Sequence, residues 1–368
     1  MSDVLRNALH YGDLSFRDFV ELALYHPQFG YYARSENPVG KDADYVTAPV
    51  LSPVFSFALS NLVREFVRRN EGALCSIVDI GCGDGGLIES VARCPLPVAS
   101  DVRFFGVDRE LGRVALDDST TRRLVDYVRT IDELPRDGAH LFISNELYDA
   151  FPFARLVKRG EHVHELWVTV QDGVLDWTER EAPPAYDDYF AANGVELAEG
   201  QFADVSLEWE AYHADVARFL QHGLIVTIDY GFPANKLFHT RARRFGTAAA
   251  YAGQRVSRDL LANPGEQDLT AHVNFSDLER AGEHHGATTL FFDRMAKFLL
   301  SLGVTEHELF RPVHDLSIDN PEQGMQLIEA REEARRLVLP DGIGEEMRVL
   351  VQAKNVELDG WSFQQTLY

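Results

Sequence analysis

The segment SIVDIGCGDGGL at residues 76–87 has the pattern of a buried strand that breaks into a glycine turn and then starts a helix. Its alternating glycines, Gly81, Gly83 and Gly85, permit positive φ angles and carry no Cβ, so the backbone can come close to a ligand. The next strand is expected to end on Asp108. A strand, a glycine turn, a helix and a second strand with a terminal acid are typical of a βαβ nucleotide site.

The spacing and charge of this turn narrow the class of nucleotide. The turn lacks the GxGxxG/A spacing of dinucleotide sites, although Gly86 makes a GxGxGG variant, and the chain has no GxxxxGK[ST] triphosphate loop. Acids at Asp79 and Asp84 would repel phosphates and suit a cationic ligand that carries an amino acid. The pattern resembles motif I of class I S-adenosylmethionine methyltransferases, which implies that Asp79 orients the methionine ammonium and Asp108 the ribose hydroxyls. For the glycines alone, an ordinary tight βα turn is the alternative.

The apolar pattern along the chain predicts an open α/β sheet with insertions. Strands are expected near 76–80, 103–108, 125–129, 139–145, 223–231 and 288–292, with amphipathic helices at 14–26 and 54–69. Three strands joined by short turns are expected within 153–180, as a β-meander inserted in the fold. The predicted fold class is therefore α/β, a class I methyltransferase (Rossmann-like) open sheet with an N-terminal helical segment and an inserted meander.

The length of 368 residues exceeds that of a typical single domain and predicts one large domain with insertions. The expected division is an N-terminal helical and lid segment at 1–70, a methyltransferase domain at 71–310 with insertions at about 153–207 and 232–274, and a C-terminal extension at 311–368 packed on the core.

Charge and cysteine content limit the classes of partner. A net charge of −23 argues against binding to nucleic acid or an anionic membrane and favours basic protein segments, with solubility as the alternative explanation. No apolar run is long enough to predict a membrane span.

The three cysteines have no paired spacing and no nearby histidine cluster, so neither a disulfide nor a metal site is predicted. With no secretory signal or presequence character at the N-terminus, the predicted location is cytoplasmic.

Five separated segments together resemble one family. They are LALYHPQFGYY at 22–32, GKDADYVTAPVLSPVF at 40–55, NELYDAFP at 145–152, IDYG at 228–231 and NPGEQDLTAHVNF at 263–275. In this order they resemble the MidA-like methyltransferases, relatives of the mitochondrial protein arginine methyltransferase that assists complex I assembly. The resemblance runs from about residue 15 to about residue 303.

The resemblance implies a donor, an acceptor class and a lid. The implied donor is S-adenosylmethionine, and the implied acceptor is an arginine nitrogen of a protein. Residues 38–53 are implied to close over the donor, with Thr47 and Pro49 among the cofactor-binding residues. The sequence departs from the family in three places: motif I reads DIGCGDG where the family usually has ExGxGxG, Ala154 stands where a histidine is common, and Ala249 where a basic residue is common. The two alanines favour, as an alternative, a pocket redirected to a small molecule.

The candidate catalytic residues follow two predicted strand ends and one later motif. Asn145 and Glu146 follow the strand at 139–145, at the carboxyl edge where open α/β sheets bind ligands. Asn145 is assigned to the cofactor, while the Glu146 carboxylate could pair with a guanidinium and fix its plane, with Asp149 sharing that work. His272 is the candidate proton acceptor, since imidazole titrates near neutral pH. The structural alternatives are a helix cap for Glu146 and a packed core position for His272.

Three functions therefore stay open at this point. The first is a methyltransferase that acts on arginine of a protein partner. The second is an O- or N-methyltransferase of a small molecule or peptide natural product. The third is a donor-binding assembly factor with little turnover, whose acidic surface docks a basic partner.

Overall fold

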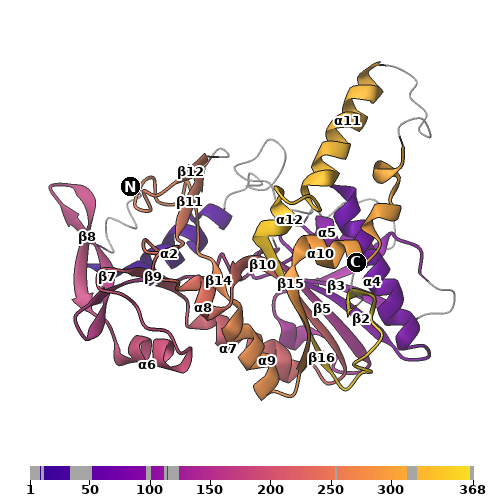
Figure 1. Cartoon of the computed structure of the whole chain (residues 1–368), viewed down its shortest axis with the longest axis horizontal. Coiled ribbons are helices and arrows are strands. Elements are labelled where there is room, and N and C mark those ends of the chain that lie inside the picture. Colours follow the sequence, from indigo (N-terminus) through magenta and orange to yellow (C-terminus); the bar gives the residue numbers. More distant parts are fainter. Residues whose placement is uncertain are drawn as a thin grey trace. The chain divides into compact units, whose positions relative to one another are not determined.

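The computed structural model in Figure 1 describes residues 9, 12–33, 52–96, 101–111, 114, 124–252, 255–312 and 321–364. The chain folds as two compact units that interleave along the sequence. Unit 1 consists of 1–45, 147–213 and 230–281, and unit 2 consists of 46–146, 214–229 and 282–368. The prediction divided the chain into three consecutive parts, with boundaries at about residues 70 and 310. In the structure, each unit consists of three segments that alternate along the chain with those of the other unit.

Unit 2 is built on a seven-strand path in the order β15-β16-β10-β5-β2-β3-β4. The strands are β2 (Cys75–Ile80), β3 (Val102–Val107), β4 (Val125–Val128), β5 (Ala139–Asn145), β10 (Gly223–Phe232), β15 (Thr288–Arg294) and β16 (Met347–Lys354). β2 pairs in parallel with both β3 and β5, β3 with β4, and β5 with β10, whereas β15 and β16 are antiparallel. The predicted open α/β sheet is confirmed.

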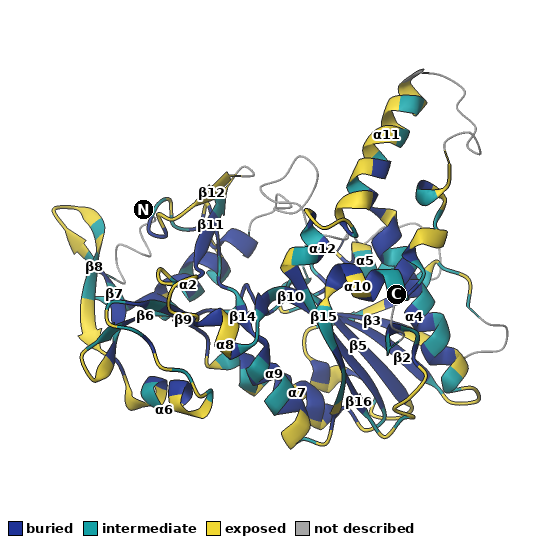
Figure 2. Cartoon of the chain, in the orientation of Figure 1, coloured by how far each residue is buried: buried dark blue, intermediate teal, exposed yellow. Residues whose placement is uncertain are grey.

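The central strands of this sheet are buried on both faces, which explains their unbroken apolar sequences. Every residue of β2 is buried, and so is every residue of β5 before Asn145 (Figure 2). Helix α4 (Pro53–Arg69) begins where the Ser52 side chain accepts a hydrogen bond from the Val54 amide, with Pro53 at the first helical position. Helix α5 (Gly86–Ala92) starts directly after the glycine turn.

The C-terminal part of the chain differs from the prediction of an extension packed on the core. β16 lies inside the sheet, between β10 and β15, and its residues are almost all buried. The residues after β16 are anchored on α4, because the Arg69 guanidinium stacks 4.2 Å from the Trp361 ring and the Ser362 hydroxyl donates to Glu65 over 2.6 Å. Pairing between strands that are far apart in the sequence leaves no local pattern. For this reason, β16 was not predicted from the sequence.

Unit 1 contains a five-stranded antiparallel sheet in which the predicted meander is found. β6 (Ala154–Arg159), β7 (His162–Gln171) and β8 (Val174–Glu181) pair in succession, β9 (Phe202–Val205) pairs with β6, and β1 (Leu14–Ser15) pairs with β7. Helix α2 (Phe16–Tyr25) continues β1, and its buried phenylalanines pack in a core cluster of this unit. Residues 14–25 of the N-terminal segment are therefore part of the core of unit 1.

The predicted insertion at about 232–274 forms helices and strands over its described part. It holds α8 (Ala234–Leu237) and a small sheet of β11 (Ala249–Ala252), β12 (Arg255–Ser257) and β13 (Asp268–Thr270), while β14 (Val273–Asn274) pairs in parallel with the end of β10. The other described helices are α6 (Pro184–Ala192), α7 (Glu208–Phe219), α9 (Phe275–His284), α10 (Met295–Ser301), α11 (Pro321–Arg336) and α12 (Ile343–Glu346). Of the helices described, none has the length and apolar character to cross a membrane.

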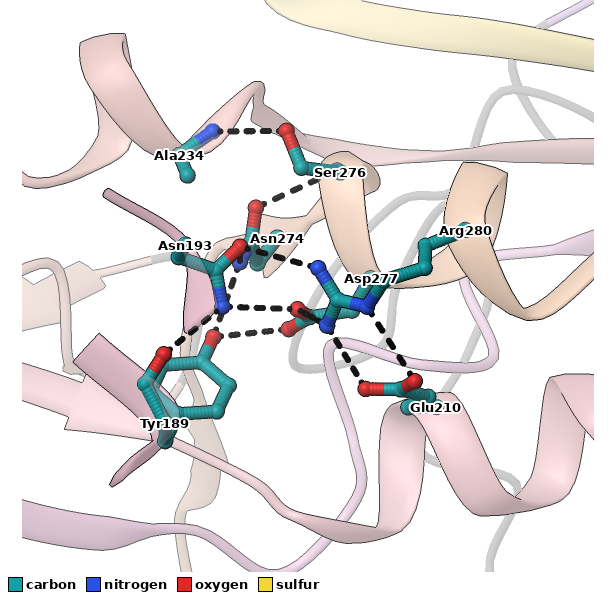
Figure 3. A network of polar contacts seen from close by, with 8 residues as sticks. All are labelled: Tyr189, Asn193, Glu210, Ala234, Asn274, Ser276, Asp277 and Arg280. Atoms are coloured by element: carbon teal, nitrogen blue, oxygen red, sulfur yellow. Dashed lines mark hydrogen bonds and ion pairs between the residues drawn. The ribbon is translucent and has the colours of Figure 1, made fainter. Parts of the chain in front are cut away.

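A buried polar network joins α6, α7 and α9 within unit 1 (Figure 3). The Asp277 carboxylate accepts hydrogen bonds from Tyr189 Oη at 2.7 Å, Asn193 Nδ2 at 3.0 Å and Arg280 Nη2 at 2.6 Å. On its more exposed side, the Arg280 guanidinium also binds Glu210 at 2.6 Å. Burial raises the pKa of Asp277, and the three donors offset part of that rise because they favour the carboxylate. A buried charge is thereby held by a full set of partners.

The two carboxylates on Arg280 are expected to differ in their contribution to stability. Replacing Asp277 by Asn should lower the free energy of unfolding by about 3 kcal/mol, because it removes the buried partner of a guanidinium. Replacing Glu210 by Gln should cost less than about 1 kcal/mol, because that pair is partly exposed. Urea denaturation followed by circular dichroism measures both values, and equal losses in the two variants would contradict the assignment.

Candidate functional site

The candidate site of unit 2 lies at the carboxyl ends of the parallel strands. The strand order reverses at β2, which has β3 on one side and β5 on the other, so this edge is a topological switch point. The glycine turn follows β2, Asp108 follows β3, and Glu146 follows β5. Asp229, fully buried, lies near the end of the neighbouring β10. Four adjacent strands thus deliver polar groups to one edge.

The amide hydrogens of the glycine turn are already used within the protein. The Gly81 amide donates to the Val107 carbonyl at 2.7 Å, the Gly83 amide donates to Asp108 Oδ2 at 2.9 Å, and the Gly85 amide donates to a carbonyl of the turn itself. All three glycines have left-handed φ angles, between 57° and 82°. The turn therefore offers close backbone approach, with nothing within 4 Å of the Cβ position of Gly83, rather than a set of donors for a phosphate.

The side chain of Tyr127 in β4 explains why two positions, Gly85 and Gly106, are glycines. The sequence analysis did not predict this role of Tyr127. A Cβ on Gly85 would overlap the Tyr127 hydroxyl, and a Cβ on Gly106 would overlap the Tyr127 ring. The hydroxyl donates to Glu89 of α5 at 3.1 Å, and burial together with that carboxylate raises the pKa of Tyr127. The ring therefore supports the turn and the first part of α5. A glycine inside the strand at Gly106 was the available signal, since it marks close packing.

Carboxylates concentrate near the turn. The Asp79 side chain is buried at the end of β2, and its pKa is raised to about 7, chiefly by burial and then by the negative charges of Asp108 and Asp84. Asp108 accepts from the Glu110 amide at 2.8 Å through Oδ1 and from the Gly83 amide through Oδ2. Such a cluster opposes anionic ligands and favours a cationic one.

Asn145 and Glu146 form the end of β5. The Glu146 amide donates to the Ile228 carbonyl at 2.9 Å, and the residue has φ 52°, a left-handed conformation that is uncommon outside glycine and often found at functional sites. Asn145 Nδ2 donates to Glu146 Oε1 at 3.2 Å. Asn145 Oδ1 is buried and has no hydrogen-bond partner within the described part of the chain. It is therefore an acceptor that a bound donor group could satisfy.

In unit 1, a backbone hydrogen bond links Asp149 to the residue that precedes His272. The Ala271 amide donates to the Asp149 carbonyl at 3.1 Å, so His272 follows directly on a residue bonded to Asp149. The His272 imidazole packs against two aromatic rings of β10, stacked with its centre 6.3 Å from that of Tyr230 and tilted with its centre 5.8 Å from that of Phe232. This stacking restricts the orientation of the imidazole.

The predicted site residues thus fall into two groups. Those predicted for the donor share the sheet edge of unit 2 with Glu146; they are Asp79, Gly81, Gly83, Gly85, Asp108 and Asn145. Asp149 and His272 lie in unit 1. Thr47 and Pro49 lie outside the described residues, together with most of the predicted lid. Over the described ranges, no group of three histidine, cysteine or acidic side chains has an arrangement that could hold a metal ion.

Comparison with known proteins supplies the chemical class. A family model described as "Putative S-adenosyl-L-methionine-dependent methyltransferase" matches residues 107–292, half of the chain. The protein arginine methyltransferase NDUFAF7, mitochondrial, of Danio rerio is 22% identical over 371 residues, which cover 91% of this chain and 82% of the relative. The Homo sapiens protein of the same name is 21% identical over 391 residues, covering 96% and 83%.

Two solved structures agree with these relatives. A Burkholderia thailandensis protein described as a "likely methyl transferase" and bound to S-adenosyl-homocysteine has 26% identity and a TM-score of 0.79, covering 97% of this chain and 91% of that one. The native structure of a protein from the same organism superposes with a TM-score of 0.76 and 26% identity, covering 98% and 92%. The predicted class I methyltransferase fold is confirmed.

The predicted cytoplasmic location is wrong by the same comparison, because the curated relatives are named mitochondrial proteins. Few cysteines and an acidic start were the basis of that prediction. Neither property separates the cytoplasm from a mitochondrial compartment, so composition alone had no means of distinguishing them.

The residues of unit 2 fit S-adenosylmethionine. This donor carries a positively charged sulfur and an ammonium group but no phosphate, which matches the carboxylate cluster and the occupied amides of the turn. The buried Asn145 Oδ1 can accept a hydrogen bond from the ammonium, and the open space at Gly83 leaves room beside the backbone.

Donor affinity is expected to depend on pH through Asp79. Positive charge on the donor favours the carboxylate, so binding releases a proton wherever Asp79 is protonated in the free protein, that is, below its pKa of about 7. The affinity for S-adenosylmethionine should therefore fall by up to about fivefold from pH 7 to pH 6, since about half of the Asp79 side chains are already protonated at pH 7. Isothermal calorimetry measures this dependence, and the Asp79→Asn variant should lack it. An unchanged slope in that variant would assign the proton to another group.

Proposed function

Because the chain belongs to the family of S-adenosyl-L-methionine-dependent methyltransferases, we propose that it methylates an arginine nitrogen in a basic segment of a protein partner. It is a MidA-like methyltransferase, and S-adenosylmethionine is its methyl donor. The arginine acceptor is supported by the names of the curated relatives, which are about 22% identical to this chain.

The observation that carries the proposal is the carboxylate of Glu146 after β5. The left-handed backbone at Glu146 turns the chain sharply at the sheet edge where the donor residues lie. A carboxylate can bind a guanidinium through two parallel hydrogen bonds and so fix its plane. A fixed plane directs one nitrogen toward the reacting carbon, which is the orientation that an in-line transfer requires.

The roles of the remaining residues follow from their charges and partners. Bound S-adenosylmethionine supplies a methyl group on a cationic sulfur, an electrophile that needs no metal. Asp79 and Asn145 are proposed to hold the methionine ammonium, and Asp108 the ribose hydroxyls through its remaining lone pairs. In unit 1, Asp149 is proposed to bind the basic acceptor segment, and His272 to take the proton that leaves the methylated nitrogen.

The two alanines behind the small-molecule alternative are buried positions in the fold. Ala154 is fully buried in β6, in a hydrophobic cluster with Leu156 and Ala203, and Ala249 is buried in β11. These substitutions therefore change packing inside unit 1 and give no support to a redirected pocket. The net charge of −23 supports a basic partner instead.

Glu146→Gln is expected to lower arginine methylation at least about 100-fold while the affinity for S-adenosylhomocysteine stays within about twofold, since the amide keeps the shape but loses the charge. The assay incubates the protein with tritiated donor and lysate, and identifies methylarginine by mass spectrometry after acid hydrolysis. Glu345→Gln, which alters an ion pair with Arg294 elsewhere in unit 2, serves as the control and should keep full activity.

The same assay separates the alternatives. Label on a small metabolite instead of a protein would establish the second function, and no label with intact donor binding would establish the assembly factor. Methylation that persists in Glu146→Gln would remove Glu146 from the acceptor site.

A further inference from the structure

Three successive carbonyl oxygens of unit 1 are held by three separate parts of the chain. They belong to Tyr148, Asp149 and Ala150 in the turn Tyr148–Phe151, called here the acceptor turn. The Tyr148 carbonyl accepts from Trp209 Nε1 at 2.7 Å, the Asp149 carbonyl from the amide of Ala271 at 3.1 Å, and the Ala150 carbonyl from the Tyr25 hydroxyl at 2.8 Å. The donors come from α7, from the stretch between β13 and β14, and from α2.

The surroundings of the acceptor turn make these bonds structural constraints rather than surface contacts. Trp209 is fully buried, and the Tyr148 side chain, 2% exposed, has its hydroxyl 2.9 Å from Nδ1 of the buried His213. The Tyr148 carbonyl also accepts the Phe151 amide at 3.1 Å, which closes the turn. Groups buried in this way cannot exchange their partners for water, so each bond fixes the turn in one direction.

We propose that Tyr25 and Trp209 are positioning residues that set the place of Asp149, and through Ala271 that of His272, for the methyl acceptor. This inference rests on the proposed function, which assigns Asp149 and His272 to the acceptor. Neither positioning side chain needs to touch a substrate. Tyr25 and Trp209 hold the carbonyls on either side of Asp149, and the Ala271 amide holds the carbonyl of Asp149 itself, so the backbone of the acceptor turn is tied to the residue before His272.

A displacement of the acceptor turn should affect turnover more than donor binding. A misplacement of about 1 Å at a reacting group can cost about 100-fold in rate. The residues proposed for the donor, including Asp79 and Asp108, belong to unit 2, whereas Tyr25 and Trp209 belong to unit 1. Loss of either hydrogen bond should therefore lower kcat and leave the KM for S-adenosylmethionine unchanged.

Trp209→Phe and Tyr25→Phe each remove one donor and keep an aromatic ring. We expect kcat for the methylated partner to fall about 10- to 100-fold, with the KM for the donor and the Kd for S-adenosylhomocysteine within about twofold of the wild type. Amide hydrogen exchange should become faster in the peptide that spans residues 147–153. This measurement reports on the mobility of the acceptor turn and does not depend on methylation activity. Should Trp209→Phe fail to fold, Tyr25→Phe tests the same turn from a partly exposed position.

Trp361→Phe is the matched control. Trp361 is also buried, in unit 2, and its Nε1 donates to the Glu357 carbonyl at 2.8 Å, so this variant removes the same kind of bond away from the acceptor turn. It should lower stability by a similar amount and leave kcat unchanged. A fall of kcat in all three variants would show a general loss of stability and would overturn the proposal. Wild-type hydrogen exchange and kcat in both Trp209→Phe and Tyr25→Phe would overturn it as well. A wild-type protein without arginine methylation would refute the proposed function, whereas the exchange measurement would still judge the positioning.

Discussion

The pairing of β2 with β3 on one side and β5 on the other is the constraint from which the site follows. Because these strands are parallel, their carboxyl ends meet at one edge, and the turn after each strand opens toward the same place. The bond from the Gly83 amide to Asp108 then ties the glycine turn to the end of β3, across 25 residues of sequence. Tyr127 completes the support from β4, and the glycines at Gly85 and Gly106 make room for its ring.

The charges at this sheet edge determine which class of ligand it can bind. A nucleotide site that binds phosphate needs free backbone donors, and here the turn amides bond to carbonyls and to Asp108. Two further acids, Asp79 and Asp84, add negative charge nearby, and burial holds the pKa of Asp79 far above that of an exposed aspartate. Negative charges placed near one another repel, and a cationic donor offsets that repulsion on binding. The preference for a sulfonium over a phosphate thus comes from the same residues that form the turn.

The sequence predicted the parts of this structure that leave a local pattern. The apolar run before Gly81 and the meander of three strands both appear within a few residues of their predicted bounds, because burial repeats with the period of the strand. β16 was missed because its partners lie about 55 residues and more away, and the sequence shows no sign of the pairing. The residues predicted for the donor lie together at one sheet edge because one βαβ motif contains most of them. Tyr127, Tyr25 and Trp209 were missed because their contacts depend on tertiary structure alone.

The division of the predicted residues between the two units carries a functional meaning. The glycine turn, the carboxylates and Asn145 belong to the sheet of unit 2, whereas α2 and the meander belong to unit 1. Asp149 and His272 are held instead by a separate core, in which α2, α7 and the stretch before β14 converge on one turn. The residues predicted for the donor and those predicted for the acceptor therefore belong to different compact units. Substitutions around the acceptor turn of unit 1 can change how the acceptor is held while the donor residues of unit 2 keep their own hydrogen bonds.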